Sequence, residues 1–267
     1  MAKEISYENR ERSYSDVLGV RIDLVQIPKV LEIVSGWIEN KEQGKYIVVS
    51  NAYDVVVCRR DPRIKNAVNS SALTVSDGIS LVLLARIKGF SVKKRVYGPD
   101  LMLNFLKVAQ EKGYSSFFYG TTEATLGLLL RHLKSEFPSL KISGCYAPPF
   151  GEMTKEEDEK VIALINGAKP DVIWVGLGCP KQQLWMYSHK DAFRVPVMVG
   201  VGAAFDFLAG VKPQAPLWIR DNGFEWLFRL VTEPKRLWRR YLIDYPLFVY
   251  YVLVELAFKP IKSLLNK

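Results

Sequence analysis

Short apolar runs alternate with segments of helical periodicity along the first 210 residues. The β-branched or aromatic runs predict strands, and apolar residues recur at helical spacing between them. The predicted strands are 17–24, 46–49, 73–75, 115–119, 141–146, 171–176 and 195–201. The predicted helices include 27–40, 54–60, 62–69, 79–88, 100–112, 123–136 and 154–167. Regular alternation of this kind predicts an α/β fold with a parallel sheet covered by helices on both faces.

The composition changes after Gly210, which divides the chain into a domain of residues 1–210 and a C-terminal appendage of residues 211–267. The first part of the appendage mixes lysines and arginines with tryptophans, a composition that suits phosphate. Arg229, Arg236 and Arg240 would share one face of a continuous helix, although Pro234 is expected to divide that helix into two.

An almost purely apolar run, residues 245–254, follows the basic part of the appendage. The run is too short to span a bilayer comfortably, Pro246 interrupts it, and lysines follow it. We therefore expect an interfacial or docking helix rather than a transmembrane span. A C-terminal helix packed on the core is the alternative.

Asp77 stands beside Gly78, where the predicted strand 73–75 ends and the helix 79–88 begins. Because α/β sheets bind ligands at the carboxyl ends of their strands, this carboxylate is the leading candidate for a catalytic base. A basic cluster that ends at Arg95 follows, and it could hold an anionic group nearby. The alternative is an Asp-Gly turn followed by a solvated basic loop.

Asn51, Gly120 and Gln182 stand at the ends of other predicted strands. Gly120 is followed by two threonines and a helix, and free backbone N–H groups at a helix N-terminus favour a diphosphate. An asparagine at a strand end can equally cap the next helix, and a plain cap is also open for the Gly120 turn. The chain contains no GxGxxG or GxxxxGK[ST] motif, so neither a dinucleotide fingerprint nor a P-loop is predicted.

The formal net charge of +9 indicates an anionic partner, which could be nucleic acid, a nucleotide sugar or an acidic membrane surface. The three cysteines are widely spaced and lie beside no histidine cluster, so neither a disulfide framework nor a zinc site is indicated. The N-terminal segment is polar and charged, which predicts no secretory signal and a protein that stays in the cytoplasm.

Seven ordered blocks carry a family resemblance: VLGVRID, SNAYDVV, VSDGISLV, KRVYGPDL, VGLGCPKQQ, GVGAAFDFLAG and WIRDNGFEWLFRLVTEPKRLWRRYL. On these blocks the sequence resembles the WecG/TagA/CpsF family of bacterial glycosyltransferases, which transfer a sugar from UDP to a lipid-linked acceptor. The resemblance implies that residues 1–210 are a Rossmann-like catalytic domain performing inverting transfer without a metal-binding DxD motif. The chain contains no Asp-x-Asp, in agreement, so neither a metal nor a cofactor is expected.

Roles for individual residues follow from the same resemblance. It makes Asp77 the catalytic base, with Asn51 and Gln182 lining the sugar pocket and Arg95 near the acceptor or the diphosphate. It also makes the appendage arginines Arg220, Arg229, Arg236 and Arg240 phosphate ligands, while Gly120 is expected to bind phosphate from its place before a helix. The chain departs from the family pattern at Val49, Gln183 and Gln214, where the family usually has Thr, Glu and Arg.

The resemblance also implies the partners. The donor is expected to be a UDP-sugar, with N-acetylmannosamine or a related hexose or uronic acid as the sugar, and the acceptor a sugar on a polyprenyl diphosphate. The protein is expected to lie on the inner face of the cell membrane, held by anionic lipid. Homo-oligomerisation stays open. A basic nucleic-acid-binding α/β protein is the alternative, but it gives no role to the carboxylate and amides at the strand ends.

Overall fold

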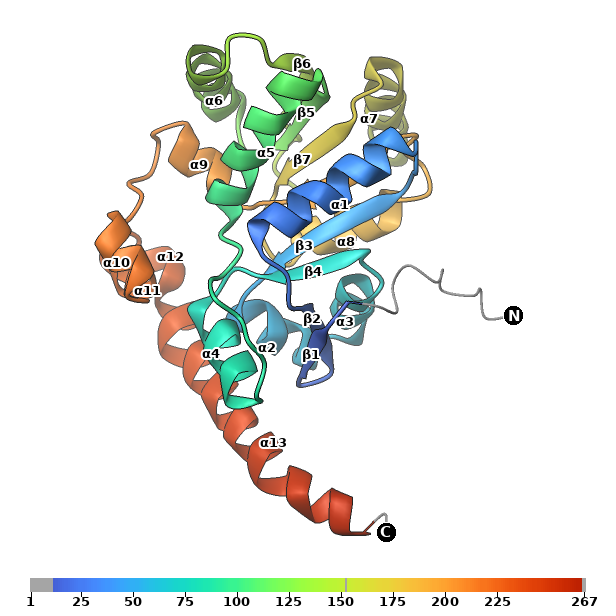
Figure 1. Cartoon of the computed structure of the whole chain (residues 1–267). Coiled ribbons are helices and arrows are strands. Elements are labelled where there is room, and N and C mark those ends of the chain that lie inside the picture. The colour runs from blue at the N-terminus through green and yellow to red at the C-terminus, as the bar shows by residue number, and fades with distance from the viewer. Residues whose placement is uncertain (1–11, 152, 266–267) are drawn as a thin grey trace.

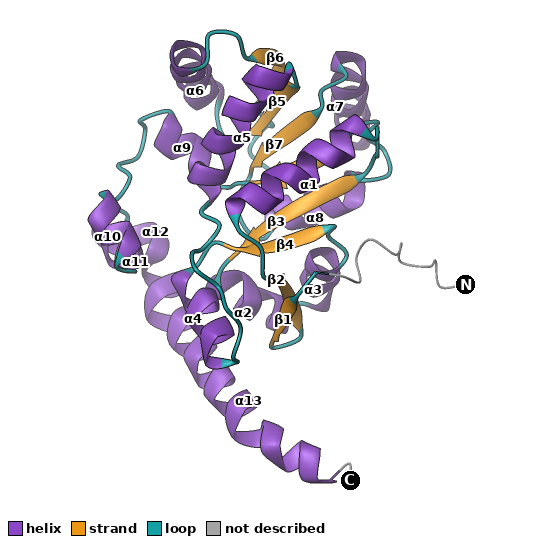
Figure 2. Ribbon diagram, viewed as in Figure 1, coloured by secondary structure: helices purple, strands orange, loops and turns teal. Residues whose placement is uncertain are grey.

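The computed structural model describes residues 12–151 and 153–265 and has one mixed sheet at its centre (Figures 1 and 2). The strand order is β1-β2-β4-β3-β8-β7-β5-β6. The strands after the N-terminal hairpin are β3 Lys45–Ser50, β4 Leu73–Ser76, β5 Ser115–Gly120, β6 Lys141–Tyr146, β7 Val172–Gly176 and β8 Val197–Gly200. All neighbouring pairs from β2 to β6 are parallel, which confirms the predicted α/β fold with a largely parallel sheet.

The first predicted strand is wrong in one respect, because residues 17–24 do not form a single strand. The chain makes an antiparallel hairpin of β1 Tyr14–Val17 and β2 Val20–Asp23. Leu18 and Gly19 both have positive φ, 55° and 81°, and a two-residue turn with this backbone matches the twist of paired strands. A leucine rarely occupies such a turn, so the apolar pattern concealed it.

Helices cover both faces of the sheet, as predicted. Their bounds are α1 Ile27–Glu39, α2 Ala52–Arg60, α3 Pro62–Asn69, α4 Ile79–Ile87, α5 Gly98–Lys112, α6 Glu123–Glu136, α7 Lys155–Ala168, α8 Lys181–His189 and α9 Ala204–Leu208. One hydrophobic core lies between the sheet and α1, α5, α6 and α9. A second core lies on the opposite face beneath α2, α3, α7 and α8. The strands are therefore buried from both sides, which explains their continuous apolar runs.

After its first loop the appendage, as far as residue 265, consists of helices joined by short turns. It contains α10 Leu217–Asp221, α11 Glu225–Thr232, α12 Pro234–Arg239, a π-helical turn Arg240–Asp244 and α13 Tyr245–Leu265. Pro234 begins α12 and so divides the basic helix, as predicted. Pro246 does not end the helix, because the π-helical turn before it already departs from the hydrogen-bonding pattern that a proline would break.

The helical stretch Pro234–Phe258 spans 25 residues and, by length and composition, is long and apolar enough to cross a bilayer. Figure 1 shows α13 running from the other appendage helices past α4 and α2 and away from the body. Phe248 on its inner face is buried in the core that α2 shares. Val249, Tyr250 and Leu253 are exposed, at 54%, 59% and 61%. Packing on the core and an open apolar surface, the two alternatives for this segment, thus belong to different faces of one helix.

Candidate active site

Asp77 follows β4 directly, and three hydrogen bonds determine its position. Its N–H donates to the carbonyl of Ser50 at the end of β3, 2.7 Å away. Its Oδ1 accepts from the N–H of Gly98, at 3.1 Å, where α5 begins. Arg95 Nη1 donates to the Asp77 carbonyl at 3.2 Å. The Gly98 N–H therefore holds the carboxylate at the carboxyl end of the sheet, while the Ser50 carbonyl and the Arg95 side chain hold the Asp77 main chain.

The surroundings of Asp77 change its acidity. Burial raises the pKa of the Asp77 carboxyl to about 6, and the neighbouring Glu225 carboxylate adds to the increase. The Arg95 cation and the Gly98 hydrogen bond lower the pKa and oppose these effects. A carboxylate with a pKa near 6 is ionised at neutral pH and is a stronger base than an ordinary aspartate.

Asn51 and Gln182 lie at the same edge of the sheet, and both make backbone hydrogen bonds. Asn51 Oδ1 accepts from the N–H of Tyr53, at 3.0 Å. Asn51 therefore caps α2, which was the alternative to ligand binding for this residue. Gln182 Oε1 accepts from the N–H of Gly178 at 3.2 Å. A Cβ added to Gly200 would lie 3.0 Å from Gln182 Nε2, so the strand approaches this amide closely. Both amides also line a cavity, so capping and ligand binding do not exclude each other.

Two adjoining cavities of about 220 Å³ and about 210 Å³ open at the carboxyl ends of the strands. Their shared lining residues are Asn51, Asp77, Glu225, Arg229 and Arg240. The first cavity continues over the ends of β3, β7 and β8 and contains Gln182 and Arg236. The second contains Arg95 together with apolar and aromatic side chains of α4 and the appendage, among them Leu83 and Trp226. Asp77 therefore stands where two ligands could meet.

The appendage supplies cations to this place. Arg229 and Arg240 line both cavities, and the Nε atom of each is buried without a hydrogen-bond partner in the described part of the chain. The guanidinium carbon of Arg240 lies 4.7 Å from the centre of the Tyr53 ring. Burial alone would lower the pKa of Arg240. Nearby tyrosines and Asp54 raise it by more than burial lowers it, so the net pKa is above the ordinary value and Arg240 stays a cation. Buried guanidinium groups with unused donors suit a phosphate ligand.

Arg95 contacts the appendage from the other side of the cavities. Its Nη2 lies 2.6 Å from Glu225 Oε2, and its guanidinium carbon lies 4.4 Å from the centre of the Tyr97 ring. This ion pair joins the loop before α5 to the start of α11. Arg95 is thus close to Asp77, as predicted, but a carboxylate of the chain already contacts it.

Two predicted residues lie elsewhere, since neither Arg220 nor Gly120 is among the residues that line the two cavities. Arg220 Nη1 lies 3.2 Å from Asp100 Oδ1, and its guanidinium carbon lies 5.1 Å from the Tyr97 ring centre. Gly120 ends β5 with φ of +131°, and a Cβ there would lie 2.7 Å from the carbonyl carbon of Gly176. Close approach of two strands explains this glycine without a ligand.

Two acidic residues of the site, Asp54 and Glu225, were not among those predicted from the sequence. Asp54 is 2% exposed, lines the first cavity and accepts from the Asn51 N–H at 2.9 Å. Burial, the largest influence, raises the pKa of Asp54, whereas the Arg240 cation lowers it. An Asp three residues after an Asn cap is the capping-box pattern, so the sequence did contain a signal for Asp54. The sequence contained no such signal for Glu225, because its partner Arg95 is remote in sequence.

Within residues 12–151 and 153–265, no three His, Cys, Asp or Glu side chains are grouped so that they could hold a metal ion. The expectation of metal-independent chemistry stays a prediction.

The sequence profile described as the glycosyl transferase WecG/TagA/CpsF family matches residues 15–262 of the chain. The chain belongs to this family. The match includes the appendage as well as the sheet, so the glycosyltransferase fold extends into the helices that carry Arg229 and Arg240.

Two curated relatives of the glycosyltransferase have the same name, N-acetylglucosaminyldiphosphoundecaprenol N-acetyl-beta-D-mannosaminyltransferase. The protein of Bacillus spizizenii strain W23 is 30% identical over 203 residues, 76% of this chain and 77% of the relative. The protein of Staphylococcus aureus strain NCTC 8325 is 29% identical over 236 residues, 88% of this chain and 90% of the relative.

Proposed function

We propose that this glycosyltransferase moves N-acetylmannosamine, or a related hexose or uronic acid, from UDP to a sugar on a polyprenyl diphosphate. The product would serve cell-surface polysaccharide or teichoic acid biosynthesis. The observation that carries the proposal is Asp77, a carboxylate with raised pKa at the junction of two cavities. The names of the two relatives support both the sugar and the class of acceptor.

The first cavity is the proposed donor site. It lies over the strand ends, where doubly wound sheets bind nucleotides, and Asn51, Gln182 and Arg236 line it. The amides of Asn51 and Gln182 would contact the sugar. Arg229, Arg236 and Arg240 would bind the diphosphate and stabilise the charge that develops on departing UDP.

The second cavity is the proposed acceptor site. Leu83 of α4 and two appendage residues, Trp226 and Tyr245, give it an apolar side. Arg95 would supply a cation for the acceptor diphosphate. A sugar bound here would present a hydroxyl to Asp77. A lipid-linked substrate requires this combination of charge and apolar surface.

The reaction then follows as a single displacement. Asp77 takes the proton of the acceptor hydroxyl as that oxygen attacks the anomeric carbon of the donor. The bond from the anomeric carbon to the UDP oxygen breaks, and UDP leaves with the bonding electrons. Attack from the face opposite UDP inverts the anomeric centre. Arginines and backbone N–H groups would take the place of a metal, because no cofactor is part of the proposal.

Membrane contact is part of the same proposal. The acceptor carries a polyprenyl chain, and α13, with its exposed apolar face, follows the basic residues of α11 and α12 in the chain. We place the protein in the cytoplasm as a peripheral protein on the inner face of the cell membrane, where anionic lipid attracts basic segments. Residues 211–267 would thus be a membrane-association and phosphate-binding unit.

A nucleic-acid-binding role is less well supported. Such a role needs a continuous exposed basic face, and two of the appendage arginines, Arg220 and Arg229, are only 12% and 13% exposed at their side chains, although Arg236 is 50% exposed. The arginines of the appendage contact carboxylates and aromatic rings instead.

The test is a screen of UDP-sugars with a short-chain lipid-diphosphate-GlcNAc acceptor, read by mass spectrometry. We expect a product larger by one sugar, formed equally well with and without EDTA. A reaction that EDTA abolishes and magnesium or manganese restores would refute the metal-independent mechanism. Absence of transfer from every UDP-sugar would refute the donor class.

A further inference from the structure

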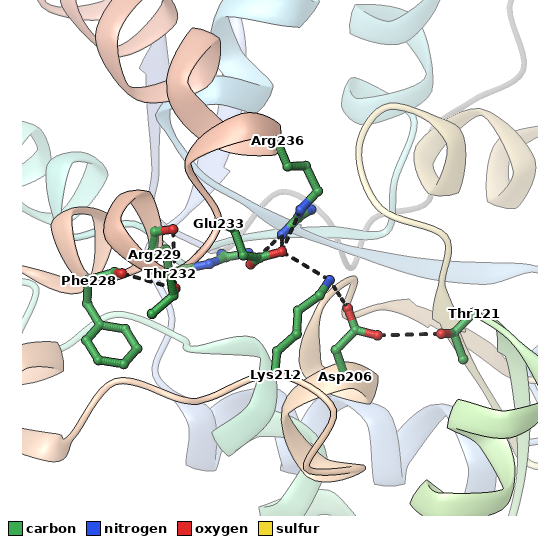
Figure 3. Close-up of polar contacts among 8 residues, drawn as sticks. All are labelled: Thr121, Asp206, Lys212, Phe228, Arg229, Thr232, Glu233 and Arg236. Atoms are coloured by element: carbon green, nitrogen blue, oxygen red, sulfur yellow. Dashed lines mark hydrogen bonds and ion pairs between the residues drawn. The ribbon is translucent and has the colours of Figure 1, made fainter.

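Glu233 lies at the junction of α11 and α12 among three cations of the appendage, as Figure 3 shows. Arg236 contacts it with two parallel hydrogen bonds, Nε to Oε2 and Nη2 to Oε1, both 2.7 Å long. Lys212 Nζ lies 3.3 Å from Oε2, and Arg229 Nη2 lies 4.0 Å from Oε1. A carboxylate surrounded in this way occupies the kind of donor set that recognises phosphate.

The arginines that contact Glu233 are residues of the donor cavity. Arg229 and Arg236 line it, whereas Glu233 is not among its lining residues. Burial raises the pKa of Glu233, but Arg236 and Lys212 lower it more, so the net pKa lies below the ordinary value. Glu233 is therefore an anion at neutral pH, and its charge neutralises the cations that would otherwise face the cavity.

We propose that Glu233 is an internal substitute for the substrate diphosphate, holding Arg229 and Arg236 in the ligand-free chain and losing them when the diphosphate binds. This inference rests on the proposed function, because it assigns the ligand of the two arginines. It adds a residue that weakens donor binding by competition.

The contacts around Glu233 permit this exchange. The Arg236 side chain is 50% exposed and can turn, whereas Glu233 is 15% exposed. Lys212 also contacts Asp206, and Asp206 Oδ1 lies 3.5 Å from Thr121 Oγ1, so Lys212 is held from the body side (Figure 3). When Arg236 turns to the ligand, Glu233 keeps Lys212 as its partner and is not left as an unpaired buried charge.

Competition for the arginines has a measurable consequence. A diphosphate has more charge and more acceptor oxygens than a carboxylate, so it displaces Glu233 but loses affinity in doing so. Removing the Glu233 charge should therefore tighten diphosphate binding. A carboxylate that merely positions the arginines would have the opposite effect, because its removal would disorder them and weaken binding.

The experiment measures the Kd of inorganic pyrophosphate and of UDP by calorimetry for the full chain and for Glu233→Gln. We expect both ligands to bind about two- to fivefold tighter to the variant, the size of one partly exposed ion pair. Uridine, which has no phosphate, should bind equally to both proteins. Unchanged or weaker pyrophosphate and UDP binding by the variant would overturn the proposal.

Glu32→Gln is the matched control, because Glu32 forms an i,i−3 ion pair with Lys29 on α1, at 2.6 Å, like the pair of Glu233 with Arg236. It should leave both Kd values unchanged. The Glu233→Gln gain should become smaller in an Arg236→Met background, where only Arg229 is left to be released, and an undiminished gain there would contradict the mechanism.

Two further outcomes separate folding and function from this inference. If Glu233→Gln does not fold, Glu233→Asp takes its place, since the shorter side chain keeps the charge but cannot form both bonds to Arg236. Its expected gain is smaller but in the same direction, and no gain would count against the proposal. A wild-type chain that binds neither UDP nor pyrophosphate would overturn the proposed function and this inference together. Equal UDP binding by wild type and Glu233→Gln would overturn the inference alone.

Discussion

The carboxyl edge of the sheet and the appendage form the same two cavities in different ways. Asp77, Asn51 and Gln182 at the sheet edge are held by backbone N–H groups that the strands and helix ends place. Arg229 and Arg236 of the appendage are held by another side chain, Glu233. Backbone contacts fix a group that must meet a reacting atom, whereas ion pairs between side chains can exchange when a charged ligand arrives. We therefore expect Asp77 at the sheet edge to act on turnover, and the appendage arginines to act on diphosphate binding as well as on the departure of UDP.

Asp77→Asn tests the sheet edge, and its effect on turnover should be the largest of those predicted. Loss of a general base lowers turnover by roughly 10²- to 10⁴-fold, while the Kd of UDP should change little because the arginines remain. Steady-state kinetics together with UDP calorimetry measure both quantities. Asp191→Asn, a change at an exposed aspartate that is 85% exposed at its side chain, is the control. Turnover near that of the wild type would exclude Asp77 as the base.

Leu253→Glu tests the appendage. It should weaken membrane binding and leave the residues at the sheet edge unaffected. Leu253 is exposed on the outer face of α13, so a charge there should reduce binding to anionic liposomes by about tenfold or more. Turnover on a water-soluble acceptor analogue should stay close to the wild-type value. Leu164→Glu, at an exposed leucine of α7, is the matched control in a co-sedimentation assay. Undiminished sedimentation of Leu253→Glu would leave the basic residues as the anchor, and high salt should then release the protein.

The pH dependence offers the smallest and most specific test. The pKa of Asp77 is raised to about 6, so below that pH the carboxyl is protonated and cannot accept the acceptor proton. We expect kcat/KM to be level above about pH 7 and to fall about tenfold per pH unit below about pH 6. Circular dichroism at each pH separates this decline from unfolding. A decline that begins only near pH 4 would show that Asp77 titrates as an ordinary aspartate.

The sequence predicted the sheet-edge residues better than the appendage for a physical reason. An apolar run that ends in Asp-Gly or Ser-Asn locates Asp77 and Asn51 at strand ends, and parallel strands bring their carboxyl ends to one edge. The pairing of Arg95 with Glu225 depends on how the appendage folds back, which local periodicity does not encode. Arg220, predicted as a phosphate ligand from composition, lies outside both cavities and contacts Asp100, so its role stays a prediction.

Turns limited the prediction of the fold in the same way. The hairpin at Leu18 and Gly19 has a backbone that strand propensity does not reveal, so two strands were predicted as one. Gly120 stood at a helix N-terminus as a phosphate site requires, but its neighbour Gly176 on β7 explains it by close strand approach. Such contacts between strands become visible only when the sheet is assembled.

The π-helical turn between α12 and α13 fixes the angle about the helix axis between Arg240 and the exposed apolar face of α13. Successive residues of an α-helix are rotated by about 100°, and a π-helical turn contains one additional residue. Arg240 begins this turn and lines both cavities, while Asp244 ends it and forms an ion pair with Arg60 of α2 at 2.6 Å. Shortening the turn by one residue would rotate the outer face of α13 about the helix axis relative to Arg240. In the proposed membrane-bound protein, that single turn would set the orientation of the enzyme on the bilayer, and so the depth at which the proposed acceptor cavity meets the lipid.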